Sequence, residues 1–253
     1  MEITTDHLLG GRVCLRQPQT GYRVAIDAVL LAAATPAVPG QRILDLGTGV
    51  GAAALCLATR VADTTVIGLE FQPELATLAR DNITANALDG RVRVIEGDLL
   101  APPPELFRDR FDLVMANPPF LKAGAHTPAA NRSRAAANGE GEATLADWIA
   151  CAATLLRPRG TLTLIHRADR VDEVLARLHP RFGGVVLFPL WPRAGAVAAK
   201  RILVSARKDV RSPATFAAGL VLHNDGRGYS AQTEMILFGG ESLQIRNQPL
   251  GRA

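Results

Sequence analysis

Short runs of apolar residues alternate along the chain with longer stretches in which apolar side chains recur every three or four positions. The short runs are typical of buried strands, and the longer stretches are typical of helices that pack one face on a core. Glycine, proline or acidic residues follow most of the short runs, as expected where a strand leads into a turn. In the first half of the chain this pattern predicts strands at residues 41–46, 65–70, 91–95 and 111–117, and helices at 52–62 and 73–86.

The same pattern continues in the second half of the chain. Strands that alternate with helices indicate a mostly parallel sheet with helices on both faces, which is a doubly wound α/β fold. The last two predicted strands have no helix between them, so we expect them to form an antiparallel pair at the end of the sheet. The elements predicted here are helices at 145–156 and 170–178 and strands at 160–166, 185–190 and 201–206.

The first 37 residues follow a different pattern. Residues 8–11 read as a turn, residues 12–16 alternate as a half-buried strand does, and residues 22–34 favour a helix. We interpret 1–37 as an N-terminal hairpin and helix extension that packs on the core. Residues 38–253 are interpreted as one domain with a basic C-terminal segment. Residues 121–144 form a long connection rich in small residues, which is typical of a functional or a disordered loop.

The composition is that of a globular protein: 48% of the 253 residues are hydrophobic and 21% are charged. No apolar run is long enough to predict a transmembrane helix, which needs about 18 residues. The first residues lack the basic and apolar regions of a signal peptide. The three cysteines match no disulfide or metal-ligand spacing, so a reducing cytoplasm is the expected setting.

The net charge is +4, and the basic residues are unevenly distributed. Between Arg193 and Arg211 there are six basic residues and one acid, Asp209. A basic surface favours a polyanion such as RNA, because phosphate contacts release counterions. A solvated charged face is the alternative interpretation.

The stretch Asn117-Pro-Pro-Phe120 follows the fourth predicted strand. Two successive prolines have no backbone donors, so they end the strand and leave Asn117 at the carboxyl edge of the sheet. The Asn117 amide oxygen and the Pro118 carbonyl can together accept two N–H bonds from a planar amine, and Phe120 can stack on its ring. A strand followed by a proline-rich turn of no chemical role is the alternative interpretation.

A glycine turn, Gly47-Thr-Gly49-Val-Gly51, follows the first predicted strand and opens a helix, as in nucleotide-binding turns. Its spacing differs from the dinucleotide fingerprint, and the lysine of a P-loop is missing. Asp45 before the turn would repel a pyrophosphate and attract an ammonium group. Glu70, at the next strand end, is placed to accept ribose hydroxyls, and Asp98 could accept an adenine amino group. Acids that only cap helices are the alternative.

Together these sites resemble class I S-adenosylmethionine-dependent methyltransferases. The resemblance covers roughly residues 38 to 208 and implies a seven-stranded Rossmann-like sheet with an antiparallel seventh strand. It implies S-adenosylmethionine as cofactor and no metal. The catalytic residues that it implies are Asn117, Pro118, Pro119 and Phe120, and the cofactor-binding residues are Tyr22, Asp45, Gly47, Thr48, Gly49, Gly51, Glu70, Phe71, Asp98 and Asn117.

A narrower resemblance reaches both ends of the chain. Residues 8–13, Asp27-Ala-Val-Leu-Leu31 and residues 223–230 are similar to the bacterial tRNA adenine-N6 methyltransferase group. This resemblance implies tRNA as partner, without a membrane. Methyl transfer to guanine in rRNA or to a release-factor glutamine, and a non-catalytic cofactor-binding RNA binder, are the alternatives. The five histidines show no spacing that suggests metal or general-base work. The residues expected to contact RNA are Phe120, Lys122, Arg132, Arg134 and Arg193.

Overall fold

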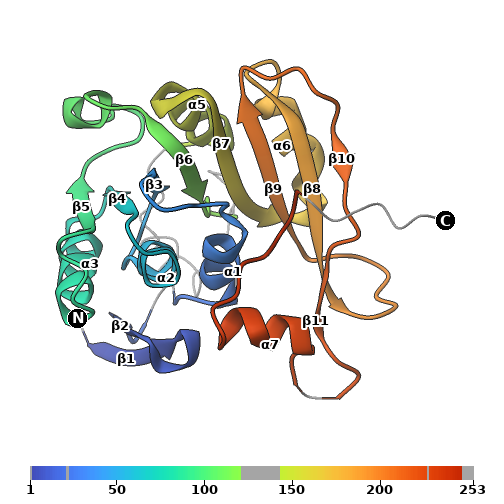
Figure 1. Ribbon diagram of the computed structural model, residues 1–253, viewed down its shortest axis with the longest axis horizontal. Coiled ribbons are helices and arrows are strands. Elements are labelled where there is room, and N and C mark those ends of the chain that lie inside the picture. Colours follow the sequence, from blue (N-terminus) through green and yellow to red (C-terminus); the bar gives the residue numbers. More distant parts are fainter. Residues whose placement is uncertain (1, 21–22, 121–142, 227, 247–253) are drawn as a thin grey trace, which may run out of the picture.

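The computed structural model describes residues 2–20, 23–120, 143–226 and 228–246. The described residues form one large sheet in the order β10-β8-β9-β7-β6-β3-β4-β5, with β11 paired to β8 (Figure 1). The five parallel strands at one end of this order are β5 Val92–Glu96, β4 Thr65–Glu70, β3 Arg42–Leu46, β6 Phe111–Ala116 and β7 Leu156–Arg167.

The other end of the sheet contains the antiparallel strands. β9 (Arg201–Lys208) lies between β7 and β8 (Phe182–Arg193) and is antiparallel to both. The antiparallel pairing that we expected for the last two strands is therefore confirmed. Two short strands, β10 (Thr215–Phe216) and β11 (Leu220–His223), run parallel to β8 along its outer side.

Helices cover both faces of the sheet, which completes the doubly wound fold (Figure 1). One hydrophobic core packs the first face and includes the apolar sides of α1 Ile26–Ala34, α2 Ala52–Arg60, α3 Pro73–Ala85 and α7 Ala231–Leu237. The second core packs the other face and includes α5 Leu145–Leu155 and α6 Val171–Leu178. Short 3-10 turns lie at Leu9–Gly11, Pro104–Phe107 and Ala168–Arg170.

The N-terminal hairpin forms its own two-stranded sheet, β1 (Ile3–Leu8) with β2 (Val13–Pro18). Two asparagines, Asn82 in α3 and Asn86 directly after it, bond the backbone of β2 much as a neighbouring strand would. Asn86 bonds both the N–H and the carbonyl of Cys14, and Asn82 does the same at Arg16. Asn82 also donates to the carbonyl of Val50, 3.0 Å away, so one side chain ties the hairpin to the glycine turn.

The sequence pattern located all seven expected strands, and the structure adds features that it did not indicate. The sheet contains β10 and β11 as well, and α7 follows them. The helix expected over 22–34 begins only at Ile26, because Val24 donates its backbone N–H to the Gln17 side chain and Ala25 is extended. The strand expected at 160 begins at Leu156, where the backbone turns from the end of α5 into extended geometry.

Candidate active site

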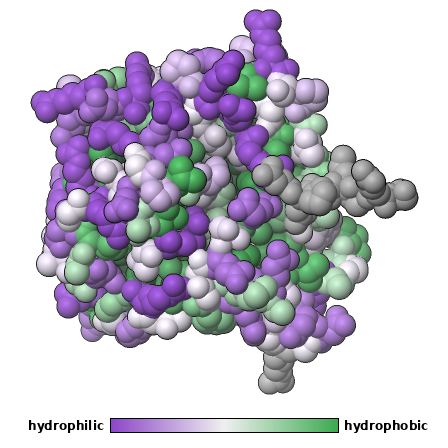
Figure 2. Space-filling view, in the orientation of Figure 1, coloured by the Kyte–Doolittle hydropathy of each residue, from purple (hydrophilic) through white to green (hydrophobic). Residues whose placement is uncertain are grey.

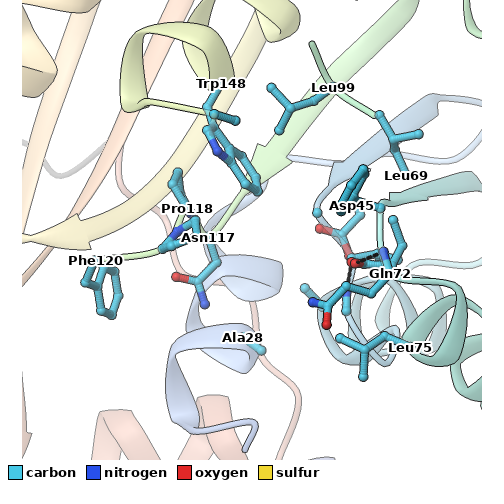
Figure 3. Close-up of a pocket in the computed structure, with 18 of the residues that line it drawn as sticks. Ala28, Asp45, Leu69, Gln72, Leu75, Leu99, Asn117, Pro118, Phe120 and Trp148 are labelled. Carbon is cyan, nitrogen blue, oxygen red and sulfur yellow. Dashed lines mark hydrogen bonds between the residues drawn. The ribbon is translucent and has the colours of Figure 1, made fainter. Parts of the chain in front are cut away.

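A cavity of about 860 Å³ opens at the carboxyl edge of the parallel strands. Its size suits a small organic ligand. Asp45, Gly47, Glu70, Asp98 and Asn117 all line it, although they follow or end four different strands. Figure 3 shows Asn117 and Trp148 on one side of this space, with Asp45 and Gln72 opposite. The structure therefore places the amide of Asn117 and the glycine turn in one crevice.

The glycine turn has the left-handed backbone that glycine permits. Gly47 has φ +69°, and a Cβ there would overlap the indole ring of Trp148. Gly49 has φ +58°, and nothing lies within 4 Å of where its Cβ would be. The turn is therefore closed on the Trp148 side and open at Gly49, where a ligand can approach the backbone.

Glu70 ends β4 with its carboxylate held against the turn. Its Oε2 accepts the backbone N–H of Gly49 at 2.7 Å, and its Oε1 accepts that of Gln72 at 2.9 Å. Burial raises the pKa of this carboxyl, and the backbone N–H bonds partly oppose the rise. Each oxygen of an ionised carboxylate can accept more than one hydrogen bond, so Glu70 keeps acceptor capacity for ligand hydroxyls.

Asp45 is almost completely buried, with 3% of its surface exposed. Its Oδ2 accepts a hydrogen bond from the Thr48 hydroxyl at 2.6 Å. Burial raises the pKa of Asp45 to about 6, and the Thr48 bond lowers it less than burial raises it. A buried carboxyl of this kind gains from a cationic group placed beside it.

Asp98 and Phe71 complete the side of the cavity near β4 and β5. Asp98 lies two residues beyond the end of β5, and its Oδ1 accepts the backbone N–H of Leu100 at 2.9 Å. Phe71 is 52% exposed although it lines the cavity. An exposed aromatic ring next to Glu70 offers a stacking surface to a planar ligand.

Asn117, Pro118, Pro119 and Phe120 all line the opposite side of the cavity. Phe120 is held both at its ring and at its backbone carbonyl. The guanidinium carbon of Arg201 in β9 lies 4.4 Å from the ring centroid, and Arg201 Nε donates to Asp27 Oδ2 in α1 at 3.0 Å. Arg170 Nη1 also donates to the carbonyl of Phe120 at 3.3 Å.

His166, at the end of β7, meets the edge of the same ring, with centroids 5.5 Å apart and planes at 78°. The imidazole is fully buried, and burial together with the nearby Arg170 charge lowers its pKa to about 4. His166 is therefore neutral at physiological pH. The spacing of the histidines did not single out His166 as a site residue, because its contact with Phe120 joins residues that are 46 apart in the sequence.

Trp148 belongs both to the core and to the site. It is 8% exposed, and it also lines the cavity and packs on Gly47. Arg193 is exposed at the end of β8 and is not among the residues that line the cavity. Tyr22, Lys122, Arg132 and Arg134 lie outside the described residues.

In the described part of the chain, no group of three or more His, Cys, Asp or Glu residues is placed to hold a metal ion. None of the described helices combines the length and the apolar character needed to cross a membrane.

An open α/β sheet with a cavity at the carboxyl ends of its strands is the arrangement in which such folds bind nucleotides and related cofactors. The profile of the methyltransferase small domain family matches residues 23–186. The chain therefore belongs to this family and is an S-adenosylmethionine-dependent methyltransferase.

Two relatives and one solved structure show the extent of the similarity. A Porphyromonas gingivalis protein named tRNA1(Val) (adenine(37)-N6)-methyltransferase is 39% identical over 178 residues, which are 68% of this chain and 69% of the relative. An Aeromonas salmonicida protein of the same name is 31% identical over 217 residues, 82% of this chain and 85% of the relative. A structure from Agrobacterium tumefaciens, described as a predicted O-methyltransferase, has 30% identity and a TM-score of 0.72, and the match covers 88% of this chain and 100% of that one.

The residues present fit this cofactor. The open backbone at Gly49, the remaining acceptors of Glu70 and the exposed ring of Phe71 suit an amino-acid and nucleoside ligand. The buried Asp45 carboxyl suits its positive charge.

Proposed function

We propose that this protein transfers a methyl group to the exocyclic amino nitrogen of adenine in tRNA, in the cytoplasm. One observation carries the proposal: the Asn117 amide, the glycine turn and Glu70 line a single cavity. The names of the relatives support the choice of adenine and of tRNA. We also propose that residues 38–253 form the methyltransferase domain and that residues 1–37 are an extension that packs on it.

The cofactor-binding side of the cavity consists of Asp45, Gly47, Thr48, Gly49, Gly51, Glu70, Phe71 and Asp98. Bound S-adenosylmethionine supplies an electrophilic methyl group on sulfur. Glu70 accepts hydroxyl bonds, and Asp45 and Asp98 accept N–H bonds. The turn at Gly49 allows close approach of the ligand to the backbone.

The acceptor side is formed by Asn117, Pro118 and Phe120. The amino nitrogen of adenine is a poor nucleophile, because its lone pair is delocalised into the ring. The Asn117 Oδ1 and the Pro118 carbonyl accept its two hydrogens and favour a pyramidal nitrogen. The same acceptors stabilise the positive charge that develops on nitrogen, while Phe120 stacks on the extruded base.

The described residues around Asn117 favour direct transfer without a dedicated base. Glu70 and Asp45 are engaged by the glycine turn and Thr48, and His166 packs against Phe120 rather than lining the cavity. The proton of the methylated amine can leave to solvent after transfer. Positioning and charge stabilisation then supply most of the rate.

The test is methyl transfer from labelled S-adenosylmethionine to total tRNA, followed by digestion to nucleosides. We expect the label in N6-methyladenosine. The variant Asn117→Ala should lower kcat by at least about 100-fold, because it removes a charge-stabilising acceptor, while the cofactor Kd changes less than about two-fold. Label in guanosine, in a ribose oxygen or in protein would refute the adenine assignment. Cofactor binding without any turnover would favour the non-catalytic alternative.

A further inference from the structure

The basic residues between Arg193 and Arg211 do not lie together, because β9 carries them from one end of its strand to the other. β9 crosses the sheet from Arg201, which contacts Phe120, to Arg207 and Lys208. Six residues at about 3.3 Å each separate Arg201 from Arg207 by roughly 20 Å. The register of β9 on β7, Arg201 with Arg167 and Arg207 with Thr161, places these two arginines at opposite edges of the sheet. Basic residues that are close in the sequence therefore lie on two separate surfaces of the protein, one near Arg201 and one near Arg207.

The second of these surfaces, which we call the amino-edge cluster, gathers five cations from three segments. Strand register places Lys208 opposite Phe182 and Arg207 opposite Gly183. The two side chains are consecutive in β9 and leave opposite faces of the sheet, and Lys208 Nζ donates to the Leu156 carbonyl at 2.8 Å. Arg246 reaches the same place from the C-terminal segment, where its Nη1 donates to the Gly184 carbonyl at 3.0 Å and its Nε to the Ser205 hydroxyl at 2.9 Å. The members of the cluster are Arg181, Arg207, Lys208, Arg211 and Arg246.

The amino-edge cluster lacks neutralising partners within the described residues. None of its five side chains forms a salt bridge there, and the adjacent acid is Asp209. Burial and, to a smaller extent, the charge of Arg207 lower the pKa of Arg246, whose Nη2 is buried without a hydrogen-bond partner in the described part of the chain. Figure 2 shows hydrophilic side chains along the upper border of the molecule, where β9 ends in Figure 1.

Five like charges with a single adjacent acid, Asp209, are stabilised by an external anion. We propose that the amino-edge cluster is a second RNA-contact surface, which binds phosphates of a folded RNA whose target base lies in the active-site cavity. This inference rests on the proposed tRNA substrate. The separation of roughly 20 Å favours a long polyanion over a small one, because a folded RNA can bridge both edges and a mononucleotide cannot.

The experiment reverses two charges of the cluster that are exposed and free of described ion pairs, Arg181→Glu with Arg211→Glu. Filter binding of total tRNA between about 50 mM and 200 mM salt measures the affinity and its salt dependence. We expect Kd to rise by about ten-fold near 150 mM salt and the slope of log K against log salt to fall by about two, one for each lost phosphate contact. The KM for tRNA should rise in parallel, with kcat and cofactor Kd unchanged.

The matched control is Arg80→Glu with Arg108→Glu, because both residues are exposed and lie toward the β5 end of the sheet. It changes the net charge equally, so it measures the effect of overall charge. Equal Kd and slope in the two double variants would overturn the inference. Loss of binding to polyglutamate with tRNA binding unchanged would also overturn it, in favour of an acidic protein partner. The binding assay needs no methylation, so it remains informative if the adenine assignment fails.

Discussion

The orientation of the Phe120 ring is predicted to depend on Arg201, which contributes nothing to the lining of the cavity itself. Arg201 lies over the ring at 4.4 Å and is anchored to Asp27 at 3.0 Å. The perturbation is Arg201→Gln, which removes the cation and the ion pair and leaves a shorter, uncharged polar side chain.

The contacts give the size of the effect. An arginine over an aromatic face is worth about 0.5–1 kcal/mol when exposed and about 2 when desolvated. Arg201 and Asp27 are 33% and 15% exposed, so both the ring contact and the ion pair lie between those limits. A loss of about 1–2 kcal/mol from the stacking orientation corresponds to roughly a ten-fold fall in its population. We expect kcat/KM for tRNA to fall by about ten-fold, with cofactor Kd unchanged.

The assay is a double-mutant cycle of Arg201→Gln with Phe120→Leu, measured as kcat/KM for tRNA. If Arg201 acts through the ring, its removal has little further effect once Phe120 is leucine. Arg201→Lys should restore part of the activity. Arg167→Gln is the matched control, because Arg167 opposes Arg201 across the strands and pairs with Asp169. Independent effects of Arg201→Gln and Phe120→Leu, or an equal loss in Arg167→Gln, would refute the reasoning.

Two further predictions concern the cofactor side. The folded pKa of Asp45, about 6, exceeds its ordinary value of 3.8, so its contribution to stability is greatest below about pH 4 and falls by about 3 kcal/mol as the pH rises to about 6. Asp45→Asn should flatten that part of the pH profile in urea unfolding, and an unchanged profile would contradict the burial argument. Gly47→Ala should lower the free energy of unfolding by more than about 2 kcal/mol, because the new Cβ overlaps Trp148 in a left-handed backbone. Gly49→Ala, with open space around its Cβ, should cost about 1 kcal/mol in the same measurement, and equal losses would show that the overlap is unimportant.

The sequence predicted those helices and strands whose formation is determined by their own local pattern of apolar and polar residues. The seven strands expected in the large sheet are segments of five or more residues, rich in apolar side chains and ended by local signals, and all of them form. β10 and β11 have two and four residues and exist because they pair with β8. α7 has seven residues and is fixed by packing on α1 and β11, which no local pattern reports.

The residues of the candidate site also fall into two groups, those that the sequence could predict and those that it could not. Asp45, Glu70 and Asn117 were predictable, because each ends or follows a strand and parallel strands end at one edge. His166 and Arg201 reach Phe120 from β7 and β9, and their positions depend on strand order and register. Strand order beyond the parallel core is a tertiary property, so neither contact could be predicted from the chain alone.

The N-terminal extension contributes to the site, although the sequence pattern separated it from the methyltransferase domain at residue 37. Pro18, Thr20, Val24, Ala28 and Leu31 all line the cavity, so residues before 38 form part of its wall. Asp27 anchors Arg201, and Asn82 ties the hairpin to the glycine turn at Val50. A segment that only covered the sheet would make apolar contacts alone, whereas this one also holds both sides of the site. The cavity therefore depends on Pro18, Thr20 and the described residues 23–31 as directly as on the strand ends, because removing them would open one wall and release the cation that holds Phe120.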